Sequence, residues 1–393
     1  RLPGVFMYRS EERILTSHVG SLPRPSNILE RVYAHQNGTP FDDAYWATVE
    51  EAVVDVVGQQ IQCGIDIVDD GELGKVGFTN YLTDRLEGLG GETEMWSFHD
   101  LDEVPEVAER QYASESGQHI NMPACIGAIR YVGFNEIQRD LEILRRAVEQ
   151  HGTQRAFVPA VSPGAVVFQI VNRHYPSYED YLMSVAEAMR SEYEAIAAAG
   201  FMLQIDSPDL AMSSPAHSRF WATDKVMALG HRGFIELHLE ALNLATANIP
   251  PEQLRLHLCW ANYEGPHHHD AALIDVLEPV LRMARPRTIS FEAANPRHEH
   301  EWQIFEDLKL PDDMAIMPGL IDSTTNFVEH PELVAQRIER YARLVGRERV
   351  IAGTDCGFAT YAGFGEVHPR AAWLKLGSLG EGAAIASKRL WPA

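Results

Sequence analysis

The sequence predicts an α/β fold and, within that class, a single (β/α)8 barrel. From Arg13 onward, short β-like segments alternate with longer helical segments, which is typical of a parallel sheet. Eight such β-like segments are present, and this number fits a barrel better than an open sheet. Polar residues stand at or just past their carboxyl ends, where barrels carry their active sites. A doubly wound sheet also binds ligands there, but no Gly-x-Gly-x-x-Gly motif follows the first segment.

The expected strands are short, mainly apolar runs that end at breakers or polar residues. The first runs into Pro23 and Pro25, and the fourth is closed by Ser207 and Pro208. Runs of this length with such boundaries are typical of strands. The expected strands are residues 13–22, 65–72, 157–162, 201–206, 254–260, 288–292, 315–322 and 350–355.

Each expected strand is followed by a segment with helical character. In the clearest of them, Val53, Val56, Val57 and Ile61 recur at the spacing of one helix face. Gly64 ends this helix, as glycine commonly does. The expected helices are residues 45–63, 135–151, 178–199, 271–284, 299–308, 332–344 and 369–390, and residues 218–247 are expected to hold one or more helices.

Residues 74–132 interrupt the alternation with mixed polar and aromatic sequence. We expect them to form an insertion after the second strand that covers the barrel mouth and contains a strand near residues 130–132. No repeat, linker or low-complexity segment divides the chain, so residues 1–393 are expected to form one catalytic barrel domain.

The composition excludes several classes of function. The chain has 393 residues, a hydrophobic fraction of 45% and a formal net charge of −23. That charge argues against nucleic acid or an anionic membrane as a partner, because both require basic patches. No apolar run approaches the length of a membrane span, and we expect no signal peptide. Four cysteines are too few for a disulfide scaffold, so we expect a cytoplasmic protein with free thiols.

A candidate metal site begins in the segment Leu-Arg-Leu-His-Leu-Cys-Trp-Ala-Asn, residues 254–262. His257 and Cys259 are two residues apart and therefore point to the same face of a strand. Glu292 ends a later strand and Cys356 follows the last one. An imidazole, two thiols and a carboxylate form a ligand set that zinc accepts. The alternative is that His257 and Cys259 are ordinary strand residues and Cys356 is a buried small apolar residue.

The ligand types favour one kind of chemistry. Two thiolates make zinc electron-rich and a poor acid for activating water, whereas such a site can hold a substrate thiol as a thiolate at neutral pH. A free thiol has a pKa near 8.5, and coordination removes its proton. A bound thiolate remains nucleophilic toward an alkyl carbon. The ligand set therefore points to S-alkylation rather than hydrolysis.

At these residues the chain resembles the catalytic C-terminal barrel of cobalamin-independent methionine synthase and, more closely, the single-barrel zinc thiol alkyltransferases related to it. The resemblance runs from the first expected strand to the last. The segments that carry it are Thr16-Ser-His-Val-Gly-Ser-Leu-Pro-Arg-Pro25, Asp70-Gly-Glu72, Gln204-Ile-Asp206-Ser-Pro, His257-Leu-Cys259, Phe291-Glu292-Ala, Pro318-Gly-Leu-Ile-Asp322 and Asp355-Cys356-Gly357.

The resemblance implies a cofactor, a substrate and a set of site residues. It implies Zn2+ held by His257, Cys259, Glu292 and Cys356, with the sulfur of homocysteine joining the metal. It also implies that Ser21, Glu72 and Asp206 surround the amino acid, with Glu72 and Asp206 as the expected catalytic residues.

Charge agrees with these implied roles. The carboxylates of Glu72 and Asp206 can pair with an ammonium group, and Ser21 with nearby backbone amides can bind a carboxylate. Without the resemblance, either acid could instead be a strand-end cap or part of an internal salt bridge. The implied activity is a methyltransferase of methionine biosynthesis.

The chain departs from the family pattern on the side of the methyl donor. It has no counterpart of the N-terminal half that helps two-barrel members to hold folate. Residues 160–168 offer no clear equivalent of the folate-stacking tryptophan, and Asp322-Ser323-Thr324 replaces the family's Asp-x-His. The donor could be a methyl-folate, a methyl-corrinoid or another compound. The general acid and the oligomeric state are not specified by the sequence.

Three other functions remain as alternatives. Epoxyalkane–coenzyme M transferase has a similar barrel, and Arg24 or Arg297 would suit the sulfonate of its thiol. Uroporphyrinogen decarboxylase has a related barrel that needs no metal. A protein that senses or stores a thiol or a corrinoid without turnover is the third.

Three consecutive histidines follow the expected fifth strand. His267, His268 and His269 lie in a Gly-Pro loop, where three adjacent side chains cannot all face one ion. We therefore expect a solvated or substrate-facing loop here rather than a second metal site.

Overall fold

A seven-stranded parallel sheet forms the centre of the computed structural model, which describes residues 7–93, 97–112, 122–214, 218–219, 224–363, 365 and 367–392. The strands follow the order β1-β12-β11-β10-β9-β7-β5. Nearly every residue in them is buried, as expected for a parallel sheet covered on both faces. Their bounds are β1 (Leu15–Thr16), β5 (Phe157–Val161), β7 (Met202–Asp206), β9 (Leu254–His257), β10 (Thr288–Phe291), β11 (Ala315–Ile321) and β12 (Ile351–Thr354).

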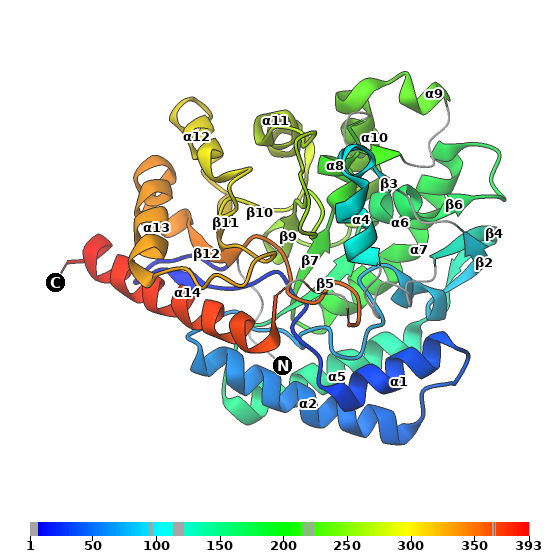
Figure 1. Ribbon diagram of the computed structural model, residues 1–393, viewed down its shortest axis with the longest axis horizontal. Coiled ribbons are helices and arrows are strands. Elements are labelled where there is room, and N and C mark those ends of the chain that lie inside the picture. Colours follow the sequence, from blue (N-terminus) through cyan, green and yellow to red (C-terminus); the bar gives the residue numbers. More distant parts are fainter. Residues whose placement is uncertain are drawn as a thin grey trace.

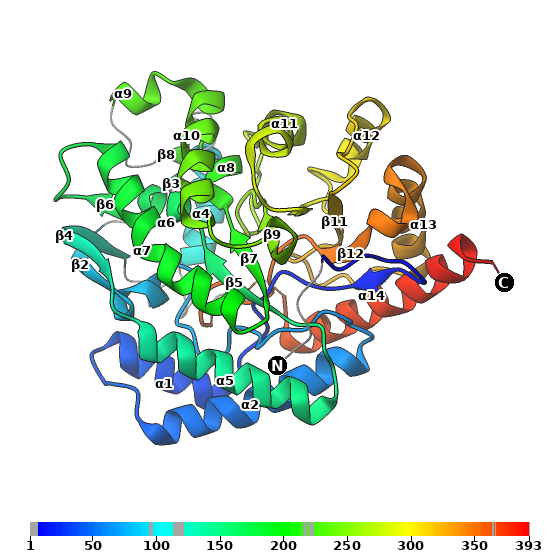
Figure 2. The same cartoon turned by 180° about the vertical axis from the view of Figure 1, so that it is seen from behind.

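Helices surround this curled sheet (Figures 1 and 2). Neighbouring helices pack in pairs, such as α2 with α5, α7 with α10 and α13 with α14. Several helices begin at a side-chain cap; Asp42, for example, accepts a hydrogen bond from the backbone N–H of Tyr45 at the start of α2. The helices are α1 (Ser26–Gln36), α2 (Asp43–Gln62), α5 (Phe134–His151), α6 (Pro163–Gln169), α7 (Tyr178–Ala198), α8 (Pro208–Met212), α9 (Asp224–Met227), α10 (Gly230–Ala245), α11 (Leu273–Met283), α12 (Ile304–Asp307), α13 (Pro331–Val345) and α14 (Pro369–Leu390).

The predicted α/β fold with a parallel sheet is confirmed, but the second expected strand is not an extended ladder. Residues 65–72 pair only through isolated bridges, Ser17 with Ile67 and Val68 with Ala156. The backbone still bonds to both neighbours: Ile67 donates to the carbonyl of Thr16 at 3.1 Å, and Val68 accepts from Phe157 at 3.0 Å. The carboxylate of Asp66 also accepts from the backbone N–H of Thr16 at 3.0 Å. The segment lies between β1 and β5, the two edge strands of the sheet.

The segment expected to be an insertion contains elements of its own. β2 (Leu86–Thr93) pairs antiparallel with β4 (Met122–Tyr131), and β4 also pairs with β6 (Val171–Asn172). The strand expected near residues 130–132 is the end of β4. The remaining elements of residues 74–132 are η1 (Asn80–Asp84), β3 (Ser97–Phe98), α3 (His99–Glu103) and α4 (Pro105–Tyr112). The strand that pairs antiparallel with β3 is β8 (Ser218–Arg219), which lies later in the chain.

A buried ion-pair network ties this segment to the helices. Arg85 donates to Glu192 on α7 at 3.0 Å and pairs with Asp140 on α5 at 2.5 Å. The hydroxyls of Tyr81 and Tyr131 both donate to Glu192 at 2.8 Å. Because Glu192 is 1% exposed, removal of one partner would leave a buried charge, at a cost of about 3–5 kcal/mol.

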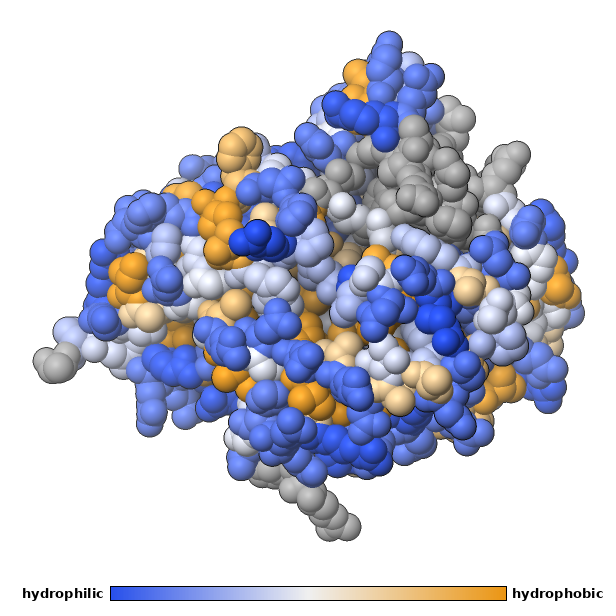
Figure 3. Space-filling view, turned by 60° about the horizontal axis from the view of Figure 1, so that its bottom comes forward, coloured by the Kyte–Doolittle hydropathy of each residue, from blue (hydrophilic) through white to orange (hydrophobic). Residues whose placement is uncertain are grey.

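The surface is mostly hydrophilic. On the face shown in Figure 3, hydrophobic residues are scattered among polar ones. In the part of the chain that the structure describes, every helix is too short or too polar to cross a membrane.

Candidate metal centre

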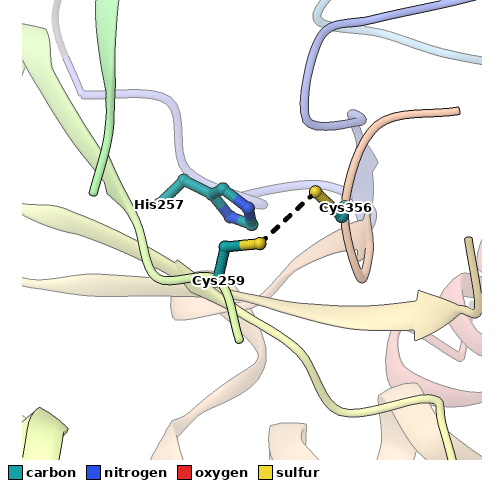
Figure 4. A group of neighbouring side chains, drawn as sticks. All are labelled: His257, Cys259 and Cys356. Atoms are coloured by element: carbon teal, nitrogen blue, oxygen red, sulfur yellow. Dashed lines mark hydrogen bonds between the residues drawn. The ribbon is translucent and has the colours of Figure 1, made fainter. Parts of the chain in front are cut away.

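Three of the four predicted metal ligands converge at the carboxyl ends of two strands. His257 is the last residue of β9, Cys259 follows two residues later, and Cys356 lies just past β12. Their ligand atoms all lie within 4.8 Å of one another, and all three side chains are buried. Figure 4 shows the imidazole and the two sulfurs facing a common point. The prediction that His257 and Cys259 point the same way is confirmed.

The two sulfurs are spaced as metal ligands. The Sγ atoms of Cys259 and Cys356 are 3.6 Å apart, far beyond a disulfide bond of about 2.05 Å. Two sulfurs bound to one tetrahedral zinc at about 2.3 Å would be separated by roughly 3.8 Å. The observed spacing therefore fits coordination of a single ion.

His257 presents a free nitrogen to this cluster. Its Nδ1 hydrogen-bonds to the hydroxyl of Ser290 at 3.1 Å, while its buried Nε2 has no hydrogen-bond partner among the described residues. Burial, aided by the charge of Arg255, lowers the pKa of His257 to about 3. The ring is therefore neutral at physiological pH, with a lone pair available to a metal.

The environment keeps a proton on Cys259 when no ion is bound. The hydrogen bond with Cys356, burial and the nearby charge of Glu292 raise the pKa of Cys259 well above its usual range. A cation at this point would reverse the effect, because a coordinated thiol loses its proton. The donor set thus fits a soft or borderline metal ion.

Glu292, the fourth predicted ligand, is not part of the close cluster. Its Oε1 accepts from the backbone N–H of Trp260 at 2.7 Å. Its Oε2 accepts from Asn295 at 2.9 Å and from Arg297 at 2.7 Å. The carboxylate is 2% exposed, and these three donors fix its position.

The loops that carry the sulfurs are joined by a residue that the sequence analysis missed. Asn262 donates to the backbone carbonyl of Gly357 at 2.7 Å and to Thr360 at 3.0 Å. Ala261 beside it has a φ of 76°, a strained conformation that is common at functional sites. The only signal in the sequence was its position just past a candidate ligand.

Asp355, for which the sequence predicted no role of its own, orders the loop after β10. Its two oxygens accept from the backbone N–H groups of Ala293, Ala294 and Asn295 at 2.7, 2.8 and 2.9 Å. A Cβ at Gly319 would lie 2.0 Å from Oδ1 of Asp355, so glycine is required there. Asp355 therefore fixes the segment that begins at Glu292.

The three predicted substrate residues lie at or just past the carboxyl ends of the strands. Ser21 accepts from the backbone N–H of Ala359 at 3.2 Å, and a Cβ at Gly357 would come within 2.1 Å of its hydroxyl. Glu72 has a φ of 55°, another strained residue at this site. Asp206, the last residue of β7, accepts from Gln204 at 2.8 Å.

Glu72 and Asp206 interact electrostatically. Burial and the charge of Glu72 raise the pKa of Asp206 well above its usual range. Lys75, which the sequence analysis missed, lies 3.5 Å from Glu72 and donates to the carbonyl of Pro159 at 2.7 Å. Lys75 is the ion-pair partner of Glu72, and the charges of Lys75 and Arg255 partly oppose the rise in the pKa of Asp206.

Both arginines considered for a sulfonate are engaged by the protein. Arg24 donates to the carbonyls of Ala359 and Glu72, each at 2.8 Å. Arg297 binds Glu292 at 2.7 Å and also binds Asp270. Neither guanidinium is left to a substrate anion without exchange of these partners.

The region expected to face a methyl donor contains a buried hydrogen-bonded chain. Ser162 caps α6 and donates to Asp209 at 2.6 Å. Asp209 bonds His238 at 2.6 Å, and His238 bonds the hydroxyl of Tyr178 at 2.9 Å. Elsewhere, Asp322 accepts from the hydroxyls of Thr324 at 2.9 Å and Thr325 at 2.5 Å, which orders the loop after β11.

The fold and the cluster define a class: an α/β protein whose parallel strands end at a candidate metal centre of one imidazole and two thiols. The model of the family described as "Cobalamin-independent synthase, Catalytic domain" matches residues 163–368, the span that contains Asp206 and all four predicted ligands. The chain therefore belongs to this family, and the resemblance inferred from the sequence is confirmed.

Individual relatives agree with this assignment. The chain is 23% identical to a methionine synthase from Thermococcus kodakarensis, with 95% of this chain and 94% of the relative covered. It is 20% identical to a 5-methyltetrahydropteroyltriglutamate–homocysteine methyltransferase from Vibrio harveyi, covering 88% of this chain but 40% of that one. These names are consistent with the predicted methyltransferase class.

Solved structures share the fold. A B12-independent methionine synthase from Shewanella sp. W3-18-1, in complex with selenomethionine, superposes with a TM-score of 0.67 at 20% identity, covering 96% of this chain and 99% of that chain. A putative vitamin-B12-independent methionine synthase from Listeria monocytogenes gives a TM-score of 0.61 at 18% identity, covering 97% and 100%.

Proposed function

We propose that this protein is a zinc-dependent methyltransferase that converts homocysteine to methionine. The observation that carries the proposal is the pair of sulfurs 3.6 Å apart beside the Nε2 of His257, which has no hydrogen-bond partner among the residues that the structure describes. Family membership supports the reaction class, and the names of the relatives support the acceptor.

We also propose that residues 1–393 form a single eight-membered barrel. The bridges of Ile67 to Ser17 and of Val68 to Ala156 support closure, because they place residues 65–72 between the edge strands β1 and β5. We take residues 74–132 as an insertion that covers part of the barrel mouth. The contact of Asp100 in α3 with Tyr263, just past β9, at 2.7 Å supports that placement.

His257, Cys259 and Cys356 would hold the zinc, with Glu292 as the exchangeable fourth ligand. When bound, the metal supplies a positive charge that stabilises the substrate sulfur as a thiolate at neutral pH. Trp260, Asn295 and Arg297 hold the carboxylate of Glu292 when it is not a ligand. Burial of the donor set keeps water from competing at this position.

The chain's other residues bind and orient the amino acid. Glu72 and Asp206 accept hydrogen bonds from the substrate ammonium, whose positive charge favours the ionised form of Asp206. Ser21 and nearby backbone N–H groups bind the substrate carboxylate. Fixing both ends of the amino acid directs its sulfur to the cluster and reduces the entropy lost at the reacting step.

The methyl transfer forms a sulfur–carbon bond and breaks the bond between the methyl group and its donor. The electron pair of that second bond leaves with the donor, and the thiol proton is released to solvent. We propose a methyl-folate as the donor, in line with the name of the Vibrio harveyi relative, and keep a methyl-corrinoid as the alternative.

The test is methionine formation by the purified full chain loaded with Zn2+, with homocysteine and each methyl donor in turn. We expect methionine with one donor and at least a hundredfold loss in Cys356→Ser, which removes one thiolate ligand. Cys63→Ser, at a half-buried cysteine far from the cluster, is the matched control. Equal activity in metal-free protein would contradict the proposal.

A panel of thiols separates this function from its nearest alternative. Because Arg24 and Arg297 already bind groups of the protein and Glu72 and Asp206 can accept from an ammonium group, we expect homocysteine to bind and coenzyme M not to bind. Binding is read from the spectrum of the cobalt-substituted protein. A spectral change with coenzyme M alone would favour the epoxide-opening function, and turnover without any metal would favour a decarboxylase.

A further inference from the structure

The loop after β9 does more than the sequence suggested. In this histidine loop, defined here as residues 263–270, the ring of His267 is buried and turns inward, with Nε2 bonded to the carbonyl of Tyr263 at 3.0 Å. A turn at His268 and His269 is closed by a bond from Asp270 N–H to His267 carbonyl at 3.1 Å. The turn allows the last two rings to face the same side, which an extended chain would not.

The two outward rings meet a carboxylate from a distant part of the chain. Nε2 of His268 lies 3.1 Å from Oε2 of Glu103, and Nε2 of His269 lies 2.8 Å from Oε1. One ligand atom from each of the three residues lies within 4.8 Å of the others. The ring centroids of the two histidines are 4.2 Å apart. The expectation that three adjacent histidines cannot share an ion holds for His267, but two of them converge.

A buried aspartate holds this arrangement in place. Asp100 is 1% exposed and accepts from the hydroxyl of Tyr263 at 2.7 Å and from the backbone N–H of His267 at 2.7 Å. Glu103 follows three residues later on α3, about one helical turn further along. His267 has a φ of 52°, a conformation that these contacts maintain. The three outward side chains are therefore presented by a fixed backbone.

We propose that Glu103, His268 and His269 form a second divalent metal site, open to solvent and distinct from the cysteine cluster. Ligand atoms around a tetrahedral ion with bonds of about 2.0 Å are about 3.3 Å apart, and the two distances from Glu103 to the histidine nitrogens, 3.1 and 2.8 Å, are close to this spacing. Two imidazoles and one carboxylate select Zn2+, Ni2+ or Cu2+ over Mg2+ and Ca2+, which prefer oxygen ligands. Water completes the coordination.

An ion at this position would join two parts of the protein. Glu103 belongs to residues 74–132, whereas the histidine loop directly follows the strand that carries His257. The same loop contains Asp270, which binds Arg297, and Arg297 in turn binds Glu292. The ion would therefore hold α3 against the loop beside the cysteine cluster and slow their separation.

Zinc binding to the full chain tests the proposal directly. After equilibration with Zn2+ alone and removal of free metal, we expect one equivalent more in the parent than in His268→Ala/His269→Ala. Glu103→Gln, which keeps both histidines, should weaken the second equivalent at least tenfold. His174→Ala/His300→Ala removes two exposed histidines outside the cluster and is the matched control. Equal zinc content in the parent and both cluster variants would overturn the proposal.

Two further readouts separate this site from the proposed function. Cys259→Ser/Cys356→Ser should lose the first equivalent and keep the second, and Co2+ in that variant should lack the thiolate charge-transfer band. Zn2+ should also slow hydrogen exchange at residues 99–103 and 263–270 in the parent but not in the histidine variant. Unchanged circular dichroism and thermal melting of the metal-free variants exclude misfolding as the cause. Failure of methionine synthesis would leave these measurements unaffected.

Discussion

Proton release on zinc binding follows directly from the geometry of the cysteine cluster. The Sγ atoms of Cys259 and Cys356 are 3.6 Å apart; a free thiol is protonated at neutral pH, and a thiol must lose its proton to become a zinc ligand. His257 contributes none, because its pKa of about 3 leaves the ring already neutral. We therefore expect about two protons to be released for each zinc ion bound at this site.

The number of protons released determines how the affinity for zinc depends on pH. Each proton released adds about 1.4 kcal/mol per pH unit to the apparent binding free energy. Binding should thus become more favourable by about 2.7 kcal/mol per unit as pH rises from about 6 to about 7.5, where free thiols are still protonated. Cys356→Ser leaves one thiol and should halve this dependence.

The assay is calorimetric titration with Zn2+ in buffers of different ionisation enthalpy, which counts protons taken up by the buffer. His268→Ala/His269→Ala provides the background, so that only the cysteine cluster is measured. A release near zero, or a value unchanged by Cys356→Ser, would refute the assignment of the sulfurs as ligands. A release near three would show that His257 is protonated before binding.

Three further predictions concern stability and substrate binding. Asp206→Asn should raise the free energy of unfolding at pH 7–8 by about 1 kcal/mol. The pKa of the buried Asp206 carboxyl is raised, so this group makes the parent protein less stable as pH rises. The same substitution should weaken homocysteine binding at least tenfold. His298→Gln should cost about 2–3 kcal/mol below pH 6.5, since hydrogen bonds outweigh burial and raise the pKa of His298 to about 9. Gly164→Ala should cost about 3 kcal/mol, because its Cβ would lie 2.1 Å from Asp209 and 2.3 Å from His238.

Urea unfolding at several pH values checks all three, with calorimetry for homocysteine. A variant at Asp206 that binds the amino acid as well as the parent would remove this residue from the site. For His298 the folded-state pKa lies above the unfolded value, so the difference from the parent should shrink as pH rises from about 6.5 to about 9; a constant difference contradicts the ion-pair explanation. An unchanged midpoint for Gly164→Ala would mean that Asp209 moves freely.

Local patterns in the sequence were enough for the class of fold and for half of the cluster. The period at which apolar residues recur distinguishes a strand from a helix. The helix α14, for example, was expected at its observed bounds, Pro369–Leu390. The shared face of His257 and Cys259 follows from the two-residue period of any strand. Glu292 and Cys356 were proposed from their positions at strand ends, and the family resemblance supported them; no local rule connects Cys259 to a cysteine 97 residues away.

Contacts between distant segments were decided only by the tertiary structure. Residues 65–72 look like an ordinary strand, yet they pair with each neighbouring segment only through an isolated bridge. The sequence predicts Glu292 as a metal ligand, but its carboxylate accepts hydrogen bonds from Trp260, Asn295 and Arg297. The spacing of residues along the chain does not predict these contacts. Packing of whole elements sets such contacts, so a single segment does not encode them.

The sequence by itself determined which side chains each strand end presents: an imidazole and a thiol after one strand, a thiol after the last. The tertiary structure alone decided which of these ends meet, and it brought Glu103 to a histidine 165 residues away. Side-chain direction depends on local backbone geometry, which neighbouring residues dictate. Distance between segments depends on the register and curvature of the whole sheet and on how the segments outside it dock, to which every element contributes.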